Sequence, residues 1–482
     1  MLFTLSILYF FQSTSSAIPV SDILRDTIPD LNCPTCQCRC PGQQRSLWDI
    51  LWSCLATLFL CTWVSVHPNI PPPGEKWWKT AIRRFELMFW AVIAPELIIL
   101  WAMRQWYGAR SMVKKYHGHT WTKTHAYFMQ MGGFTLYSGD EPLEVLLPKR
   151  MEELLLQGMI DLPKISEEEI QARSKGDGLS KALVLGQTTW FVAQCIARRA
   201  QGLILTELEL VTGAFAILNG VMYFLWWNKP LDVRFSVAVH LLDKPKETFK
   251  YELTEIPSFS ILEAITSLYH QSRKAFVHVT WILNLMCKSM HHISLRALPK
   301  VMLNVVIFPW TTARLFIRRL VDIADSDGLR RREKTGSVST VSTFSASEYP
   351  HTRSTDTYLV LSAASSVAVL FGGLHCVAWR FAFPSLAELV IWRVCSALIS
   401  IVPLMVLMVL IAGFCKDKTI HNSTSQTFFS IIRKSFFPLV IYSLPIYAIA
   451  RLLLLGEAFA TLRHLPPGAL AVVDWLSFLP HI

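Results

Sequence analysis

Five polar or charged residues lie inside long apolar stretches of the chain, and they are the residues best placed to do chemistry. They are Glu96, Gln187, Gln194, His375 and Arg451. Burying such a group in hydrocarbon is costly unless it meets a partner or water. We therefore predict that Glu96, Gln187 and Gln194 face the interior of a helix bundle.

Spacing adds one detail to this set. Gln187 and Gln194 are seven residues apart, so they share one face of a helix with a drift of about 20°. That face either lines a path for a substrate or joins two helices by hydrogen bonds, which contribute on average about 0.6 kcal/mol each in a membrane. Arg451 lies near the end of its apolar stretch, where its side chain can also reach the lipid head groups.

Four clustered cysteines form a second group with chemical potential: Cys33, Cys36, Cys38 and Cys40. They follow an apolar start, residues 1–17, that resembles a cleavable secretory signal without the usual basic residues. In an oxidising compartment four close thiols most simply pair as two disulfides, so we predict that they are oxidised. Four thiolates can also bind zinc, but the one-residue spacers are tight for such a site.

No motif for catalysis, cofactor binding or metal binding is identified. The G-x-S-x-G, H-E-x-x-H and G-x-x-x-x-G-K patterns are missing from the sequence, which removes the main support for a hydrolase, a zinc protease or a nucleotide hydrolase. His117, His119 and His125 could place imidazoles near a metal ion, but a basic interfacial loop explains them as well. We predict no catalytic residue, no cofactor and no metal ligand.

Seven apolar stretches must position the polar residues. A transmembrane helix needs about 20 apolar residues to cross about 30 Å of hydrocarbon. Stretches of this kind occupy residues 47–66, 85–103, 182–197, 208–227, 358–379, 394–414 and 436–455. They predict an all-α fold, a multi-pass transmembrane helix bundle with helical soluble connections and a disordered Ser/Thr-rich linker.

Composition and charge agree with this class. Hydrophobic residues make up 52% of the chain, and the 17 Trp and 28 Phe supply rings that favour membrane interfaces. The net charge of +11 comes from Lys and Arg between the apolar stretches, where anionic head groups attract them. We therefore predict the lipid bilayer as partner and no nucleic acid, and we leave protein partners open.

The predicted organisation has eight segments. They are a signal peptide (1–17), a Cys-rich segment (18–46), two membrane helices (47–103), a helical connection (104–181), two further membrane helices (182–227), a soluble or interfacial connection (228–324), a disordered linker (325–357), and three membrane helices with a C-terminal tail (358–482). The linker is rich in Ser, Thr and charge, so it buries too little apolar surface to fold.

Two rules for membrane topology conflict in this sequence. A cleaved signal followed by seven full crossings would place both long connections outside the cytosol. Yet the linker at 325–357 has an Arg run before its Ser/Thr residues, which suits a kinase-accessible cytosolic segment. One resolution is that 85–103, which contains Pro95, does not fully cross. We predict a cytosolic 228–357 and no glycan on Asn422, which begins an Asn-Ser-Thr sequon.

Several strings resemble a large family of fungal multi-pass membrane proteins of unassigned function. They include RSLWDILWSCLATLFLCTWVSVHPNIPPP, APELIILWAMRQ, LWWNKPLDV, GGLHCVAWRFAFPS and the terminal DWLSFLPHI. The resemblance covers nearly everything from Arg45 to Ile482 and implies a membrane-embedded fold. It supplies no activity, so it transfers no functional residues, and the cysteine cluster before Arg45 is not expected to match throughout the family.

Two function classes remain. The first is a non-enzymatic transport or signalling protein of the integral membrane class, made in the secretory pathway. The alternative is a membrane-embedded enzyme acting on a lipid, with Glu96, His375 or the region of His117 as acid and base. The candidate residues are scattered over distant segments without paired spacing, which favours the non-enzyme.

Overall fold

The computed structural model describes residues 44–71, 75–116, 120–174, 178–242, 354–418 and 423–475, with short pieces at 329–330, 340–341 and 343–346. Several predicted features lie outside the described residues: the signal peptide, Cys33, Cys36, Cys38, Cys40, His117, His119, most of 243–353, and Asn422.

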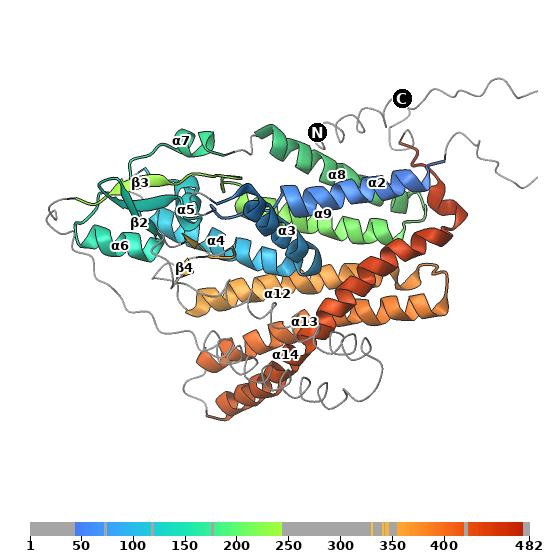
Figure 1. The fold of residues 1–482 in the computed structure, drawn as a ribbon. Helices are drawn as coiled ribbons and strands as arrows, with labels where there is room; N and C mark the ends of the chain where they lie inside the picture. The colour runs from blue at the N-terminus through green and yellow to red at the C-terminus, as the bar shows by residue number, and fades with distance from the viewer. Residues whose placement is uncertain are drawn as a thin grey trace, which may run out of the picture.

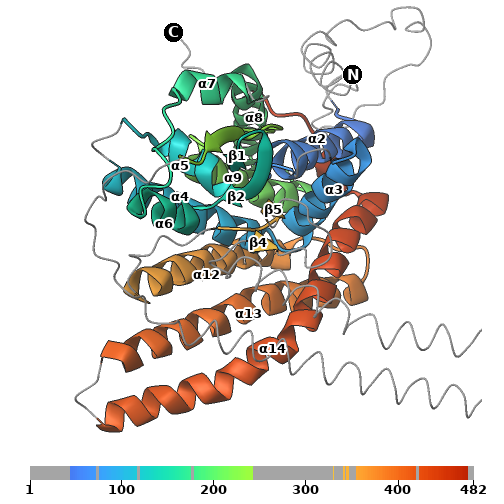
Figure 2. The same ribbon diagram turned by 60° about the vertical axis from the view of Figure 1, so that its left-hand side comes forward.

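Long helices form a bundle, and a small sheet with short helices lies at one end of it (Figures 1 and 2). The bundle contains α2 (Leu47–Phe59) with its π-helical continuation η2 (Leu60–Val64), α8 (Gly178–Ala200), α9 (Glu207–Trp226), α12 (Ser354–Cys376), η5 (Val377–Arg380), α13 (Leu386–Lys418) and α14 (Ser423–Ala460). α12, α13 and α14 pack against one another, and α9 contacts α2, α8, α12 and α14. α9 is therefore the central helix.

Among the described residues, four helices are long and apolar enough to cross a membrane: Leu47–Val64, Glu207–Trp226, Tyr358–Arg380 and Leu386–Cys415. Large apolar side chains remain exposed on them, among them Phe224, Leu370 and Ile401, which is the surface that lipid tails would cover. These helices indicate membrane association. The predicted count of seven crossings is not confirmed, because the stretches at 182–197 and 436–455 lie in α8 and α14, which are not among the four.

The second predicted stretch, 85–103, is not one straight helix. It is divided between α3 (Trp77–Ile93) and α4 (Pro95–Lys115), and the two helices are bent by 109° at the break. α4 therefore turns back by more than a right angle, which makes the pair either a broken span or a re-entrant loop.

The connection predicted as helical, 104–181, contains strands that the sequence analysis missed. After α5 (Lys123–Gln130), the strands β1 (Phe134–Ser138) and β2 (Glu141–Leu146) form an antiparallel pair, followed by α6 (Pro148–Leu156) and α7 (Glu167–Ala172). β3 (Val237–His240) pairs with β1 in parallel and completes a sheet of order β2-β1-β3. The predicted helical connection therefore contains helices together with two unpredicted strands, one of which pairs with a segment about 100 residues further along.

The predicted disordered linker also contains ordered residues. β4 (Leu329–Arg330) pairs with β5 (Thr340–Val341), and Phe344 and Ser345 just after β5 are fully buried. The Phe344 ring packs on Trp101 of α4 at 5.3 Å between ring centres. The Ser345 carbonyl accepts hydrogen bonds from side chains of α4. One aromatic side chain and one multiply bonded carbonyl therefore fix this piece against α4, which composition alone does not reveal.

The end of the bundle away from the sheet is closed by the C-terminal segment, with η6 (Thr461–His464) and η7 (Pro467–Leu470). Arg198 of α8 donates to the carbonyls of Ile204, Ala469 and Ala471. Arg45 binds the Glu209 carboxylate with two nitrogens, one of them at 2.9 Å. These arginines attach the C-terminal segment to the ends of α8 and α9.

The packing of α12 on α13 supplies a test of the bundle. A β-carbon on Gly372 would lie 2.8 Å from both the Ile399 carbonyl oxygen and the Ser400 α-carbon, whereas one on the neighbouring Gly373 meets nothing within 4 Å. We expect Gly372→Ala to lower the free energy of unfolding by about 1–3 kcal/mol. The added β-carbon would meet backbone atoms of α13, which cannot move aside as a flexible side chain could. Gly373→Ala is the matched control and should leave the melting temperature in detergent unchanged or slightly higher. Equal melting temperatures for the two variants would contradict the close approach of α12 to α13.

Candidate functional site

The break between α3 and α4 is explained by the local sequence. In a continuous α-helix the N–H group of residue 95 would donate to the Ala91 carbonyl. Pro95 has no N–H group, so this hydrogen bond is missing. The residue before a proline is also disfavoured in the helical conformation, and Ala94 has φ −143° and ψ 66°. Glu96 follows in the first turn of α4 and is thereby directed at α14.

Glu96 forms a closed polar network with two residues of α14. The Tyr447 hydroxyl donates to one carboxylate oxygen at 2.6 Å, and Arg451 Nη2 donates to the other at 2.9 Å. Arg451 Nε also donates to the Tyr447 hydroxyl at 3.1 Å. The Arg451 and Glu96 side chains are only 4% and 15% exposed, respectively. The arrangement balances one buried negative charge with one buried positive charge.

The network extends to α12 through an aromatic ring. The Arg451 guanidinium lies 4.2 Å from the ring centre of Phe371, a favourable cation–π distance. His375 lies one turn further along α12, with its ring 4.9 Å from that of Phe371, and its Nδ1 is bonded to the Phe371 carbonyl at 2.9 Å. Three of the five predicted residues, Glu96, His375 and Arg451, therefore lie around Phe371, although His375 makes no direct bond to the other two among the described contacts.

The two predicted glutamines lie elsewhere. Gln187 and Gln194 are half-buried on α8, which lies on the opposite side of the bundle from α14 in both views (Figures 1 and 2). Gln187 Nε2 approaches the Thr57 hydroxyl of α2 at 3.5 Å, at the upper limit of a hydrogen bond. Gln187 therefore takes part in the packing of α8 on α2, and no described hydrogen bond joins either glutamine to the Glu96 network.

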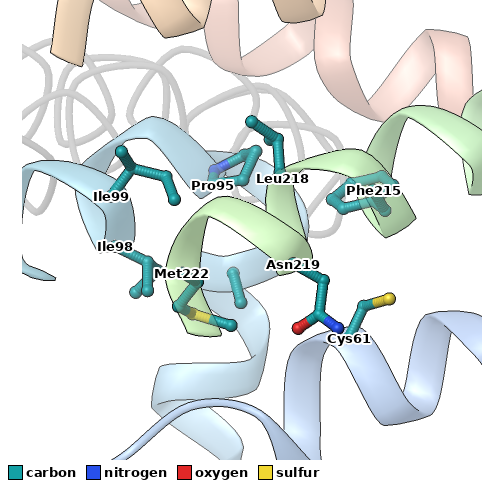
Figure 3. A pocket seen from close by; sticks show the side chains of 9 residues that line it. Cys61, Pro95, Ile98, Ile99, Phe215, Leu218, Asn219 and Met222 are labelled. Atoms are coloured by element: carbon teal, nitrogen blue, oxygen red, sulfur yellow. The ribbon is translucent and has the colours of Figure 1, made fainter. Parts of the chain in front are cut away.

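A small cavity adjoins the network at the break (Figure 3). The cavity volume that the centre of a water molecule can occupy is about 20 Å³. Its walls are Cys61 of η2, Ala91 of α3, the α4 residues Pro95, Ile98 and Ile99, and the α9 residues Phe215, Leu218, Asn219 and Met222. Asn219 is 2% exposed, and neither its Nδ2 nor its Oδ1 has a hydrogen-bond partner among the described residues. Pro95 lines the cavity and Glu96 enters the ion pair, so the two features share the start of α4.

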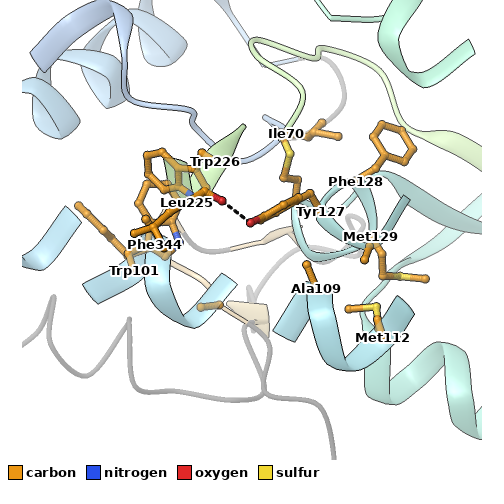
Figure 4. Packing of buried hydrophobic residues seen from close by; sticks show 14 of the residues in the cluster. Ile70, Trp101, Ala109, Met112, Tyr127, Phe128, Met129, Leu225, Trp226 and Phe344 are labelled. Atoms are coloured by element: carbon orange, nitrogen blue, oxygen red, sulfur yellow. Dashed lines mark hydrogen bonds between the residues drawn. The ribbon is translucent and has the colours of Figure 1, made fainter. Parts of the chain in front are cut away.

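A second buried network lies where α4 meets the end of α9, around Trp101 and Trp226, which Figure 4 shows side by side. Lys229 is fully buried, with its Nζ 4.3 Å and 4.4 Å from the ring centres of Trp101 and Trp226. It donates to the His67 carbonyl and approaches Asn69 Oδ1 at 3.5 Å. In the part of the chain that the structure describes, no carboxylate pairs with Lys229. Two indole faces and two oxygens therefore surround this amine in place of a counter-ion.

Burial changes the acid–base behaviour of this second network. It lowers the pKa of Lys229 well below the ordinary value of a lysine. It also lowers the pKa of His67 to about 3. The His67 ring is held by a 2.7 Å bond between its Nδ1 and the Ser65 carbonyl and packs against Trp226. Both groups therefore favour their neutral forms in the folded protein.

Metal binding receives no support from the described residues. No group of three His, Cys, Asp or Glu side chains that could hold an ion lies together in the described ranges. His125 uses both ring nitrogens within the fold, one with Thr122 and the other with the Ile165 carbonyl at 2.8 Å. Its role is to begin α5 and attach it to the segment before α7.

Sequence reasoning missed three residues of these sites. Asn219 lies in the apolar stretch 208–227, so the free-energy cost of burying a polar side chain in hydrocarbon applies to it as it does to the glutamines. Tyr447 was overlooked because a tyrosine is unremarkable in an apolar helix. Lys229 follows two tryptophans in the string WWNKP, a pattern that allows a cation–π contact but does not by itself predict burial.

Comparison with known proteins gives one family. A family model described as a family of unknown function (DUF8562) matches residues 26–117, 107–268 and 354–482. Neither the curated proteins nor the solved structures contain a match. The family description includes no organism and no activity, so the fungal resemblance stays a prediction.

The ion pair supplies the second test. Arg451→Met removes the partner of a buried carboxylate, so we expect a loss of about 3–5 kcal/mol and a lower melting temperature in detergent. The double variant Glu96→Gln with Arg451→Met should recover much of this loss because no charge is left unpaired. Arg463→Met is the control, since Arg463 is 52% exposed in its pair with Glu388 and should change the stability by less than about 1 kcal/mol. A double variant as unstable as Arg451→Met would contradict the proposed charge balance.

The third test uses the pKa of His67. Because its folded value of about 3 lies below the ordinary 6.5, the unfolded chain binds more protons between these values. Stability should therefore fall as the pH decreases from 6.5 towards 3, by at most about 1.4 kcal/mol per pH unit from this residue. We expect His67→Phe, which keeps a ring against Trp226, to flatten the decline of melting temperature with pH in that window. An unchanged slope would show that His67 is not a source of the acid sensitivity.

Proposed function

The chain belongs to DUF8562, a family of unknown function, and we propose that it is a non-enzymatic membrane transport protein with its gate at the α3–α4 break. The observation that carries the proposal is the buried Glu96–Arg451 pair at this break. Ionisable residues inside membrane bundles mark pathways for ions or substrates, and discontinuous helices form binding sites in many transporters.

The anchoring of α3 and α4 supports a re-entrant pair. In the middle of α3, Arg84 binds Asp232, which follows the end of α9. At the end of α4, Lys115 binds Glu152 of α6, beside the sheet. Both helices are therefore attached to the end of the molecule that carries the sheet, whereas Glu96 at the tip reaches α14. A pair of this shape enters the bundle and leaves on the same side.

A re-entrant pair removes the conflict between the topology rules. In this arrangement six helices cross the membrane: α2, α8, α9, α12, α13 and α14. The sheet, the 228–353 connection and the loop after α13 then lie on the same side of the membrane. A cleaved signal would make that side cytosolic. The basic loops beside the sheet and the Ser/Thr-rich linker then lie on the side that the positive-inside rule favours, whereas Arg45, Arg198 and Arg463 lie at the opposite end.

The Glu96–Arg451 network suits a gate because its ion pair joins α4 to α14. Moving α3 and α4 away from α14 would separate Glu96 from Arg451 and leave two buried charges without partners, which water or a solute would have to compensate. The closed state is therefore stabilised by the pair, and an open state requires hydration of the same residues. Such a two-state element is what transport by alternating access needs.

An enzyme acting on a lipid receives less support. Both Glu96 carboxylate oxygens already accept hydrogen bonds, and His375 Nδ1 is bonded to its own helix. Neither group faces the described cavity, whose only polar lining side chains are Cys61 and Asn219. A general base must reach the proton that it removes.

Flux through vesicles tests transport directly. The full chain, reconstituted in phospholipid vesicles, should accelerate the passage of at least one probe among water, glycerol, urea, K⁺, Cl⁻ and protons over that in protein-free vesicles. We expect Glu96→Gln to change that flux at least about tenfold, which corresponds to about 1.4 kcal/mol. Glu388→Gln, which alters the more exposed pair with Arg463, should not change it. Absence of flux for every probe would contradict transport.

Glycosylation tests the topology separately. We expect Asn422 to carry no glycan when the full chain is made in a eukaryotic secretory pathway, because its loop lies on the cytosolic side in this arrangement. A sequon appended on a flexible linker after Ile482 should be modified, since the C-terminal segment lies at the opposite end of the bundle. A mobility shift on endoglycosidase treatment that Asn422→Gln abolishes would overturn the six-crossing arrangement.

A further inference from the structure

We propose that the cavity between η2, the α3–α4 break and α9 binds one small uncharged molecule that both donates and accepts hydrogen bonds. This molecule would represent the solute class that the protein transports, so the inference rests on the function proposed above. Water, or a solute that presents one hydroxyl or amide group, fits the description.

The lining of the cavity determines the polarity of its ligand. Apart from the Asn219 amide and the Cys61 thiol, the lining side chains are apolar. A carboxamide carries two donors on Nδ2 and two lone pairs on Oδ1. Both atoms are buried and lack partners in the described chain, and leaving a buried polar group without a hydrogen bond is unfavourable. A molecule that accepts from Nδ2 and donates to Oδ1 would satisfy the whole group.

The backbone is also irregular at the same place. Ala91 and Pro95 both line the cavity, and they are the two residues between which the helical hydrogen bond is missing. The Ala91 carbonyl therefore lacks the helical donor that residue 95 would normally provide. A donor in the cavity has the side-chain oxygen of Asn219 as an acceptor, beside a backbone segment in which one helical hydrogen bond is missing.

Charge and size narrow the ligand class. No ionisable carboxylate or amine lines the cavity, and the adjacent Glu96 and Arg451 neutralise each other. An ion would enter without a counter-charge and would lose its hydration, which is far more costly than burying a neutral polar group. A space of about 20 Å³ exceeds the roughly 10–15 Å³ that one water molecule requires. The closed cavity therefore fits one water-sized group.

Two departures from regular α-helix and one polar residue of the central helix meet at this cavity. Cys61 belongs to the π-helical turn η2, Pro95 begins the helix after the break, and Asn219 interrupts the apolar face of the central helix. π-helical turns occur often at functional sites. Asn219 and Cys61 project towards the same space in Figure 3. Packing alone would be served better by a leucine at position 219, which is consistent with a role in binding.

The test measures permeability of vesicles that contain the full chain, by stopped-flow light scattering after an osmotic step with water, urea or glycerol. Asn219→Leu keeps the branched shape of the side chain and removes its hydrogen-bonding groups, so we expect it to remove at least nine-tenths of the protein-dependent permeability. Cys61→Leu fills the cavity from the opposite wall and should have the same effect. Thr212→Val is the control, because Thr212 is buried on the same helix two turns earlier and does not line the cavity. Each variant is compared at equal reconstituted amount after size-exclusion chromatography.

The outcomes separate this inference from the proposed function. Loss of neutral-solute permeability in Asn219→Leu and Cys61→Leu, but not in Thr212→Val, supports both. Passage of K⁺, Cl⁻ or protons only would overturn the uncharged class and leave transport intact. Neutral-solute permeability that persists in both cavity variants would exclude this cavity as the binding site while transport stands. A wild-type protein that passes no probe would overturn both.

Discussion

The missing N–H group of Pro95 is the local constraint on which the candidate site depends. Without it the helix that starts at Trp77 cannot continue, and the chain turns by 109° at Ala94. That turn brings Glu96 to α14 and places Ala91 and Pro95, on either side of the break, in the wall of the cavity. A straight helix through the same residues could not present both groups at one depth of the bundle. The ion pair with Arg451 in turn holds the start of α4 against α14.

The two buried networks solve the problem of a buried cation in different ways. Arg451 has a carboxylate, a tyrosine hydroxyl and an aromatic face around it, so its charge is balanced. Lys229 has two indole faces and two oxygens, and burial lowers its pKa well below the usual range. In the first network, Glu96 and Arg451 can both stay charged during a conformational change in which each exchanges its present partner for another. The second is stable with a neutral amine, which suits a fixed junction between α4 and the end of α9.

The apolar helices were predictable from sequence because each is defined by its own residues, and the stretches 47–66, 208–227 and 358–379 agree closely with observed helices. Pro95 also signalled the possible break. The pairing of Glu96 with Arg451 was not predictable, because 355 residues separate them and only packing brings α4 to α14. The sheet was missed for a similar reason: Phe134 pairs with Val237, and neither strand is recognisable alone.

The distribution of contacts along the α3–α4 pair indicates which half would move in a gate. Gln105 fixes α4, because its fully buried amide donates to Asn69 and to the Ser345 carbonyl and accepts from Trp226. Displacing α4 would leave all of these buried polar groups unpaired, at a cost of about 1–3 kcal/mol each. α3 instead exposes Ile82, Phe85 and Phe89 on one face, which lipid can solvate in any orientation. A gate at the break would therefore open by movement of α3 together with the first turn of α4, which carries Glu96, while the part of α4 around Gln105 stays fixed.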